Sequence, residues 1–190
     1  GVMIGQYFVQ FFVTPKTGAL VSALISVLTG VFLWMSVKKI SSSCCLTPLL
    51  MLPSFFYNLY LADHYVHYEG LVALLFMAVC LWLHTVFARW HYALRVAASS
   101  VLALLLYVGF GPVAVLYGLC VVLYDAFKGS AKVWLNLLPL ALVLLTGLLA
   151  VNRGLLVDLS TAYWMQGYVE YYFHPGTFYS IAWVSVPVLM

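Results

Sequence analysis

Long apolar stretches alternate with short charged turns along almost the whole chain. Between successive charged residues lie five apolar stretches of 19 to 29 residues: residues 17–37, 40–62, 70–88, 96–124 and 133–152. A helix of about 20 apolar residues, rising about 1.5 Å per residue, crosses a hydrocarbon core about 30 Å thick. Four of the five stretches therefore fit one membrane-spanning helix each.

The fifth stretch is 29 residues long and contains Gly109-Phe110-Gly111-Pro112. Two glycines weaken a helix, and proline is well suited to begin a new one. We therefore expect two helices, at about residues 92–108 and 112–127, joined by a tight turn. The alternative interpretation is one long tilted helix, which would place every later loop on the opposite side of the membrane.

Composition excludes the water-soluble and disordered classes. Hydrophobic residues make up 66% of the 190-residue chain and charged residues only 7%, whereas soluble domains are about a quarter charged. The net charge of +3 is too small and too scattered for a nucleic-acid partner. We predict an all-α fold, a polytopic transmembrane helical bundle in a single domain with membrane lipid around it. Its six complete spans and a truncated seventh are expected at about residues 17–37, 46–62, 70–88, 92–108, 112–127, 133–151 and 177–190. Because the chain starts without Met and ends in an apolar stretch, we interpret it as a fragment of a longer protein.

Lysine and arginine predict the orientation. The loops 38–45, 89–95 and 128–132 hold two basic residues each, whereas the loops between them hold none and segment 152–175 holds one. Basic loops stay in the cytoplasm. In a bacterial inner membrane, loops 63–69 and 152–175 would then lie on the outer face. The single-helix interpretation would break this alternation.

The outward loops carry the candidate chemistry. Asp63, His67 and Glu69 lie in seven residues, and Asp63 and His67 share a face if the segment is helical. Carboxylate and imidazole together could bind a divalent metal or carry out acid–base catalysis. The alternative is an ordinary polar turn between two spans.

A second pair, Glu170 and His174, repeats the acid-to-histidine spacing of four on the same predicted face. The two loops could together hold a metal or a diphosphate headgroup, and Arg153 could hold phosphate with its bidentate fork. The alternatives are an interfacial aromatic segment and a side chain that extends to lipid headgroups.

Polar side chains within the spans are few. Asn58 and Asn136 are expected to form helix–helix contacts. We find no acid or base in the middle of the predicted spans, which counts against an ion-coupled transporter.

Several short motifs carry a resemblance, and they cover most of the chain: Gln6-Tyr7-Phe8-Val9-Gln10-Phe11-Phe12, Asn58-Leu59-Tyr60, Glu69-Gly70-Leu71, Gly109-Phe110-Gly111-Pro112 and Leu123-Tyr124-Asp125. Their order resembles an uncharacterised family of many-spanning inner-membrane proteins of Bacteroidota-type bacteria, known as a domain of unknown function. The layout is loosely similar to membrane glycosyltransferases that use polyprenyl-phosphate sugars, in which an amphipathic external stretch precedes a span. In that class the catalytic acid lies in the first external loop, which would fall before Gly1, so no catalytic residue is carried over.

The resemblance and the outward polar residues favour a transferase-like protein that acts on a lipid-linked sugar phosphate at the outer face. Asp63, His67 and Glu69 would be acid–base or metal groups, and Arg153, Glu170 and His174 would bind substrate. The alternatives are a non-catalytic subunit of a membrane or envelope complex and a transporter. The sequence alone leaves open whether the protein is an enzyme.

Overall fold

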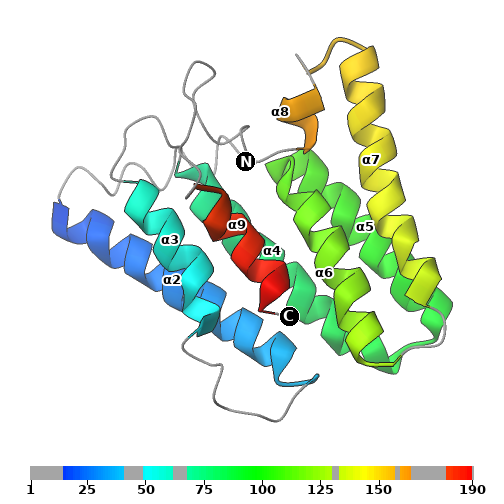
Figure 1. Ribbon diagram of the computed structural model, residues 1–190, viewed down its shortest axis with the longest axis horizontal. Coiled ribbons are helices and arrows are strands. Elements are labelled where there is room, and N and C mark those ends of the chain that lie inside the picture. The colour runs from blue at the N-terminus through cyan, green and yellow to red at the C-terminus, as the bar shows by residue number, and fades with distance from the viewer. Residues whose placement is uncertain are drawn as a thin grey trace.

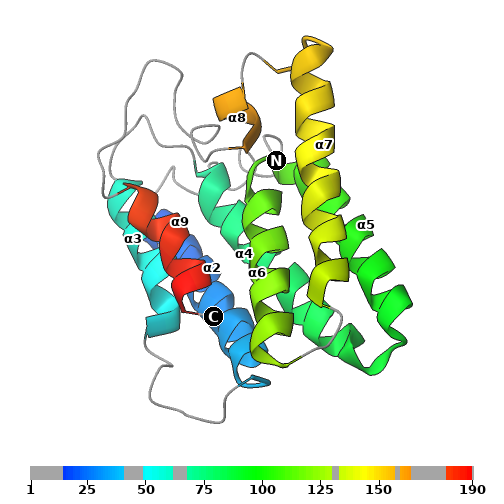
Figure 2. The same ribbon diagram turned by 45° about the vertical axis from the view of Figure 1, so that its right-hand side comes forward.

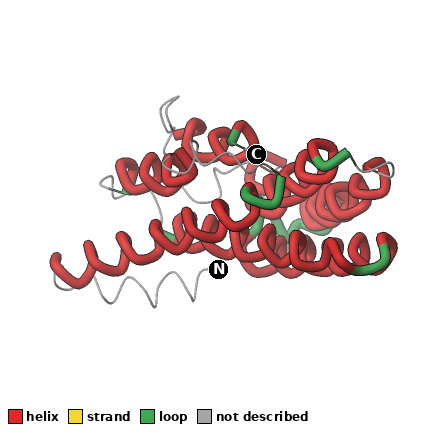
Figure 3. Tube along the Cα trace, turned by 90° about the horizontal axis from the view of Figure 1, so that it is seen from below, coloured by secondary structure: helices red, strands yellow, loops and turns green. Residues whose placement is uncertain are grey.

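The computed structural model describes residues 15–40, 49–61, 68–129, 133–156, 159–163 and 179–189, and the regular structure in these ranges is helical (Figure 3). The all-α prediction is therefore confirmed. The helices are α2 (Pro15–Val37), α3 (Leu52–Tyr60), α4 (Glu69–Val86), α5 (Tyr92–Phe110), α6 (Val113–Phe127), α7 (Leu137–Asn152), α8 (Leu159–Tyr163) and α9 (Tyr179–Val188), with 3-10 turns η3 (Phe87–Arg89) and η4 (Val133–Asn136).

Helix α4 lies in the middle of the bundle. It packs against α2 on one side and against α5 and α6 on the other. Helices α3 and α9 pack together beside α2, whereas α7 packs against α5 and α6 (Figures 1 and 2). Helix α4 lies between the two groups, which also meet directly where α9 packs on α6, and its residues are apolar on nearly every face, as expected for a helix with several neighbours.

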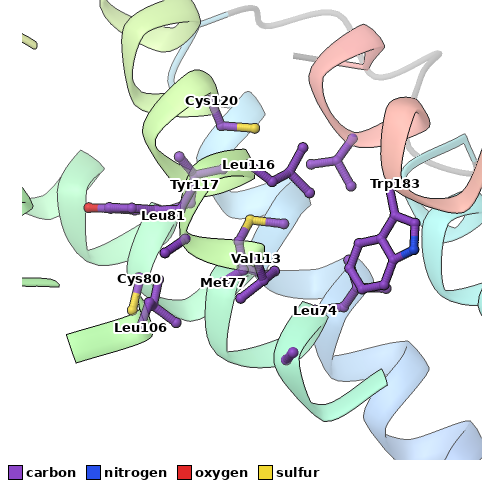
Figure 4. Close-up of a cluster of buried hydrophobic side chains, with 14 of the residues drawn as sticks. Leu74, Met77, Cys80, Leu81, Leu106, Val113, Leu116, Tyr117, Cys120 and Trp183 are labelled. Atoms are coloured by element: carbon purple, nitrogen blue, oxygen red, sulfur yellow. The ribbon is translucent and has the colours of Figure 1, made fainter. Parts of the chain in front are cut away.

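The side chains of the core come mainly from α4 and α6 (Figure 4). Leu74, Met77 and Leu81 of α4 meet Tyr117 and Cys120 of α6, and all five are fully buried. From the other side, Trp183 of α9 reaches the same cluster. The core therefore joins the two groups of helices through α4.

The 29-residue apolar stretch forms two helices, as predicted. Helix α5 ends at Phe110 and α6 begins at Val113, with Gly111 and Pro112 between them. Gly111 takes φ +74°, a left-handed conformation that glycine adopts at little cost, and its N–H donates to the Tyr107 carbonyl at 2.9 Å. The glycine thus ends α5, and Pro112 starts α6.

This turn allows a matched test of backbone conformation. A Cβ added at Gly111 or at Gly109 would meet no atom within 4 Å, but only Gly111 has a positive φ. We expect Gly111→Ala to lower the free energy of unfolding by about 1 kcal/mol, and Gly109→Ala, inside α5, to leave it unchanged or raise it by up to about 1 kcal/mol. Thermal unfolding in detergent measures both. Equal stability of the two variants would contradict the positive φ of Gly111 in this turn.

The predicted spans are confirmed only in part. Four helices of the described residues are long and apolar enough to cross a membrane: Lys16–Val37, Glu69–Arg89, Tyr92–Phe110 and Val133–Asn152. The apolar helices Leu49–Leu59 and Val113–Phe127 are shorter. Within predicted span 46–62, α3 has nine residues and a rise of about 14 Å, with Pro53 in its first turn.

The outward faces of the long helices are apolar. Leu20, Leu24, Val27 and Val31 of α2 recur at helical spacing and are exposed, and α5 and α7 carry similar rows. Val108 of α5 is 86% exposed. Monomeric proteins in water rarely show continuous apolar patches of this extent.

Candidate functional site

Four of the six predicted site residues, Asp63, His67, Glu170 and His174, lie outside the described residues. The meeting of loops 63–69 and 152–175 therefore stays a prediction. Within the part of the chain that the structure describes, no three His, Cys, Asp or Glu side chains are close enough together to hold a metal ion.

Glu69 and Arg153 can be located. Glu69 is the first residue of α4 and is half-buried, and its carboxylate complements the positive end of the helix dipole. Arg153 directly follows α7, is exposed, and its backbone N–H donates to the Leu149 carbonyl at 2.9 Å. The start of α4 and the end of α7 lie at the same end of the bundle, at the top of Figures 1 and 2.

The opposite end of the bundle holds a buried polar network. Asp125 of α6 is fully buried, and its Oδ2 accepts hydrogen bonds from the Arg95 guanidinium of α5 and from the Asn136 amide of η4. His84 of α4 is also fully buried, with Nε2 3.8 Å from the same oxygen. These residues from α4, α5, α6 and η4 form what we call the Asp125 network.

Ser99 of α5 extends the network to the second ring nitrogen of His84. The two atoms, Ser99 Oγ and His84 Nδ1, lie 2.6 Å apart, and Ser99 Oγ donates to the Arg95 carbonyl at 2.9 Å. The Ser99 hydroxyl has one proton, which it donates to the Arg95 carbonyl. Its oxygen therefore accepts from His84, and Nδ1 is the donor of the His84–Ser99 bond. In neutral His84 this leaves Nε2 without a proton, in agreement with its longer distance from Asp125.

The Asp125 network has the properties of a structural clamp. Arg95 and Asp125 cancel in charge, and removing one of them would leave the other buried and uncompensated. His84 and Asp125 each lie two residues before the end of their helix, which is about 3 Å along the axis. The network therefore closes one end of the bundle and does not cross its middle.

This network revises one expectation and confirms another. Arg95 and Asp125 were expected to bound their apolar stretch, yet both are buried inside the bundle. Asn136, in contrast, joins η4 to α6, as a helix–helix contact should. The sequence contains one signal for the network: the predicted orientation puts Asp125 alone among the acids at the end with the basic loops, where a buried carboxylate would need a cation.

A groove on the outside of the bundle separates α2 from α3. It has a volume of about 420 Å³ and is lined by small side chains such as Ala19, Ser22 and Ala23. Beside it, the Asn58 amide donates to Ser26 Oγ at 2.7 Å, so the expected helix–helix role of Asn58 is confirmed. The small side chains of α2 leave this space open between the two helices.

Comparison with known proteins identifies the family but no activity. A model of a family of unknown function (DUF6057) matches residues 2–190, so the chain belongs to that family. No curated protein and no solved structure matches the chain. The resemblance to a family of unknown function is thereby confirmed, whereas the glycosyltransferase-like layout stays a prediction.

Proposed function

We propose that this member of the DUF6057 family is a multi-pass integral membrane protein of a bacterial inner membrane, with six complete spans and a seventh at its C-terminal end. The observation that carries the proposal is the rows of exposed apolar side chains along α2, α5 and α7. The apolar helical segments that contain these rows, Lys16–Val37, Tyr92–Phe110 and Val133–Asn152, are long enough to cross a bilayer. The polar side chains of the Asp125 network point inward, as lipid around the bundle would require.

The helix ends support one sidedness. The Lys39 ammonium bonds Thr85 at the end of α4, and Arg95 at the start of α5 pairs with Asp125 at the end of α6. The described parts of the three basic loops therefore lie at one end of the bundle, which we call the basic end. We propose that the basic end faces the cytoplasm.

Cysteine labelling tests this topology. In a chain without its native cysteines, we expect Asn152→Cys to react with a membrane-impermeant maleimide on intact cells. Ala126→Cys should react only after the membrane is permeabilised. Both positions are exposed and neither is charged, so the basic residues that orient the chain are unchanged. Labelling of both positions from the same side would refute the topology.

We further propose a transferase-like activity on a lipid-linked sugar phosphate at the outer face. Asp63, His67 and Glu69 would be acid–base or metal groups, Glu170 and His174 would complete the site, and Arg153 would hold phosphate. An acid that activates the acceptor and a cation that stabilises the departing phosphate are what such a transfer requires. The residue types support this proposal, as do the exposed position of Arg153 and its location at the same end of the bundle as Glu69.

Binding of undecaprenyl phosphate to the full chain in nanodiscs tests the phosphate role. We expect Arg153→Gln to weaken binding about tenfold, as loss of a charged hydrogen bond implies, and Arg153→Lys to restore part of it. Lys38→Gln, an exposed cation at the basic end, is the matched control. Unchanged binding in Arg153→Gln and Glu69→Gln would favour the alternative, a non-catalytic subunit whose outer cluster tolerates replacement.

The transporter alternative gains no support from the Asp125 network. Coupled transporters place their ion or substrate sites near the middle of the membrane. His84 and Asp125 lie instead about one half-turn from the ends of α4 and α6.

A further inference from the structure

Three exposed cations gather at the basic end from three separate elements. Lys39 follows α2, Arg89 is the last residue of η3, and Lys128 directly follows α6. They belong to three different predicted cytoplasmic loops, and only the packing of α2, α4 and α6 brings them together.

The position of Lys39 is fixed by a hydrogen bond. Its Nζ donates to Thr85 Oγ1 at 2.8 Å, and Thr85 Oγ1 donates to the Trp82 carbonyl at 2.6 Å. The lysine head is therefore held at the last turn of α4, immediately before Arg89. An ammonium has three protons, so two remain for another acceptor.

The three cations repel one another. The pKa of the Lys39 ammonium lies below its usual value of 10.5, first because of partial burial and then because of the charges of Lys128 and Arg89. An anion placed between the three side chains would relieve this repulsion.

The two acids of the described residues cannot balance these charges. Asp125 is fully buried and bonds Arg95 and Asn136. Glu69 lies at the other end of the 18-residue α4, about 26 Å away along the axis, far beyond the screening length of about 8 Å at physiological salt. The described part of the basic end therefore has a positive surface that no exposed acid offsets.

Aromatic side chains place this surface at the depth of lipid headgroups. Lys38 lies over the Trp34 ring at 4.7 Å, and Lys128 lies 5.7 Å from the Tyr124 ring. Trp90 stacks on Phe87 at 4.5 Å yet stays 52% exposed. Tryptophan and tyrosine concentrate at the boundary between hydrocarbon and water.

We propose that Lys39, Arg89 and Lys128 form a binding site for the phosphate of an anionic phospholipid in the cytoplasmic leaflet. The inference rests on the proposed membrane location, but not on the proposed transferase activity. Arg89 offers a planar fork and the two lysines offer point charges, a combination that suits a phosphodiester held at the membrane surface.

Lipid retention by the purified full chain tests the site. In native mass spectrometry from mixed micelles, we expect the wild type to retain phosphatidylglycerol in preference to phosphatidylcholine. Each of Lys39→Gln, Arg89→Gln and Lys128→Gln should reduce that preference about fivefold, and the triple variant should abolish it. The variant Lys16→Gln removes an exposed cation at the opposite end of α2 and should keep it. A cooperative thermal unfolding transition shows that each variant is folded. If the triple variant is not folded, the three single variants decide the test.

Three outcomes would overturn the site. One is an undiminished preference for phosphatidylglycerol in the triple variant, and another is an equal loss in the Lys16→Gln control. The third is displacement of the lipid by millimolar inorganic phosphate, which would indicate a site for free phosphate. Failure of the membrane proposal is distinguishable, because the chain would then be released from membranes by alkaline carbonate.

Discussion

Replacing Asp125 by alanine is expected to destabilise the protein by about 3–5 kcal/mol, a larger loss than we expect from any other single substitution in the bundle. The substitution removes the acceptor of both the Arg95 guanidinium and the Asn136 amide, and it leaves a guanidinium buried without a counter-charge. Reversible unfolding in mixed micelles, followed by tryptophan fluorescence, measures the loss. After incubation at 37 °C, we also expect most of the variant protein to elute away from the native volume in size-exclusion chromatography.

A double substitution separates the cost of a broken pair from the value of the intact pair. Because the buried guanidinium is removed as well, Arg95→Met/Asp125→Leu should be more stable than Asp125→Ala, with a remaining loss of about 1–3 kcal/mol because the buried Asn136 amide has lost its acceptor. Arg153→Gln, an exposed cation outside the network, should change the free energy of unfolding by no more than about 0.5 kcal/mol. An Asp125→Ala variant as stable as Arg153→Gln would show that the network does not clamp the helices.

Local patterns in the sequence were enough for the helices and their order. The distance between Lys16 and Lys38 predicts α2, and the glycines before Pro112 predict the break between α5 and α6. These features act within one helix or one turn, so they can be read without knowledge of the fold. The shortness of α3 could not be predicted in this way, because apolar residues continue on both sides of it.

The polar contacts could not be predicted, because they join residues far apart in the sequence. Asp125 is 30 residues from Arg95, and Lys39 is 46 residues from Thr85. In the sequence, Arg95 and Asp125 mark the two limits of an apolar stretch. Their burial follows from helix packing, which the charge pattern does not contain. For the predicted outer site, the described residues give only the positions of Glu69 and Arg153, so its chemistry stays a prediction.

A close contact between α3 and α4 gives the second large expected effect. Gly70 lies in the first turn of α4, and a Cβ there would be 2.7 Å from Cε2 of Tyr57 and closer still to Cζ and Oη. Tyr57 is fully buried and cannot easily withdraw, because its ring packs edge-on against Trp183 of α9 at 5.4 Å. Gly70→Ala should therefore push α3 away from α4, at a cost of about 1–3 kcal/mol.

A double-mutant cycle assigns this cost to the contact. In a Tyr57→Ala background the added methyl group finds space, so Gly70→Ala should cost much less there, with a coupling energy of at least about 1 kcal/mol. Gly109→Ala is the matched control, since a Cβ there meets nothing within 4 Å and alanine favours the helix. A Gly70→Ala protein at least as stable as Gly109→Ala, with no coupling to Tyr57, would contradict the packing of α3 on α4. Loss of that packing would move α3 relative to the first turn of α4, where Glu69 precedes Gly70. The contact at Gly70 thus links helix packing to the geometry of the proposed outer site.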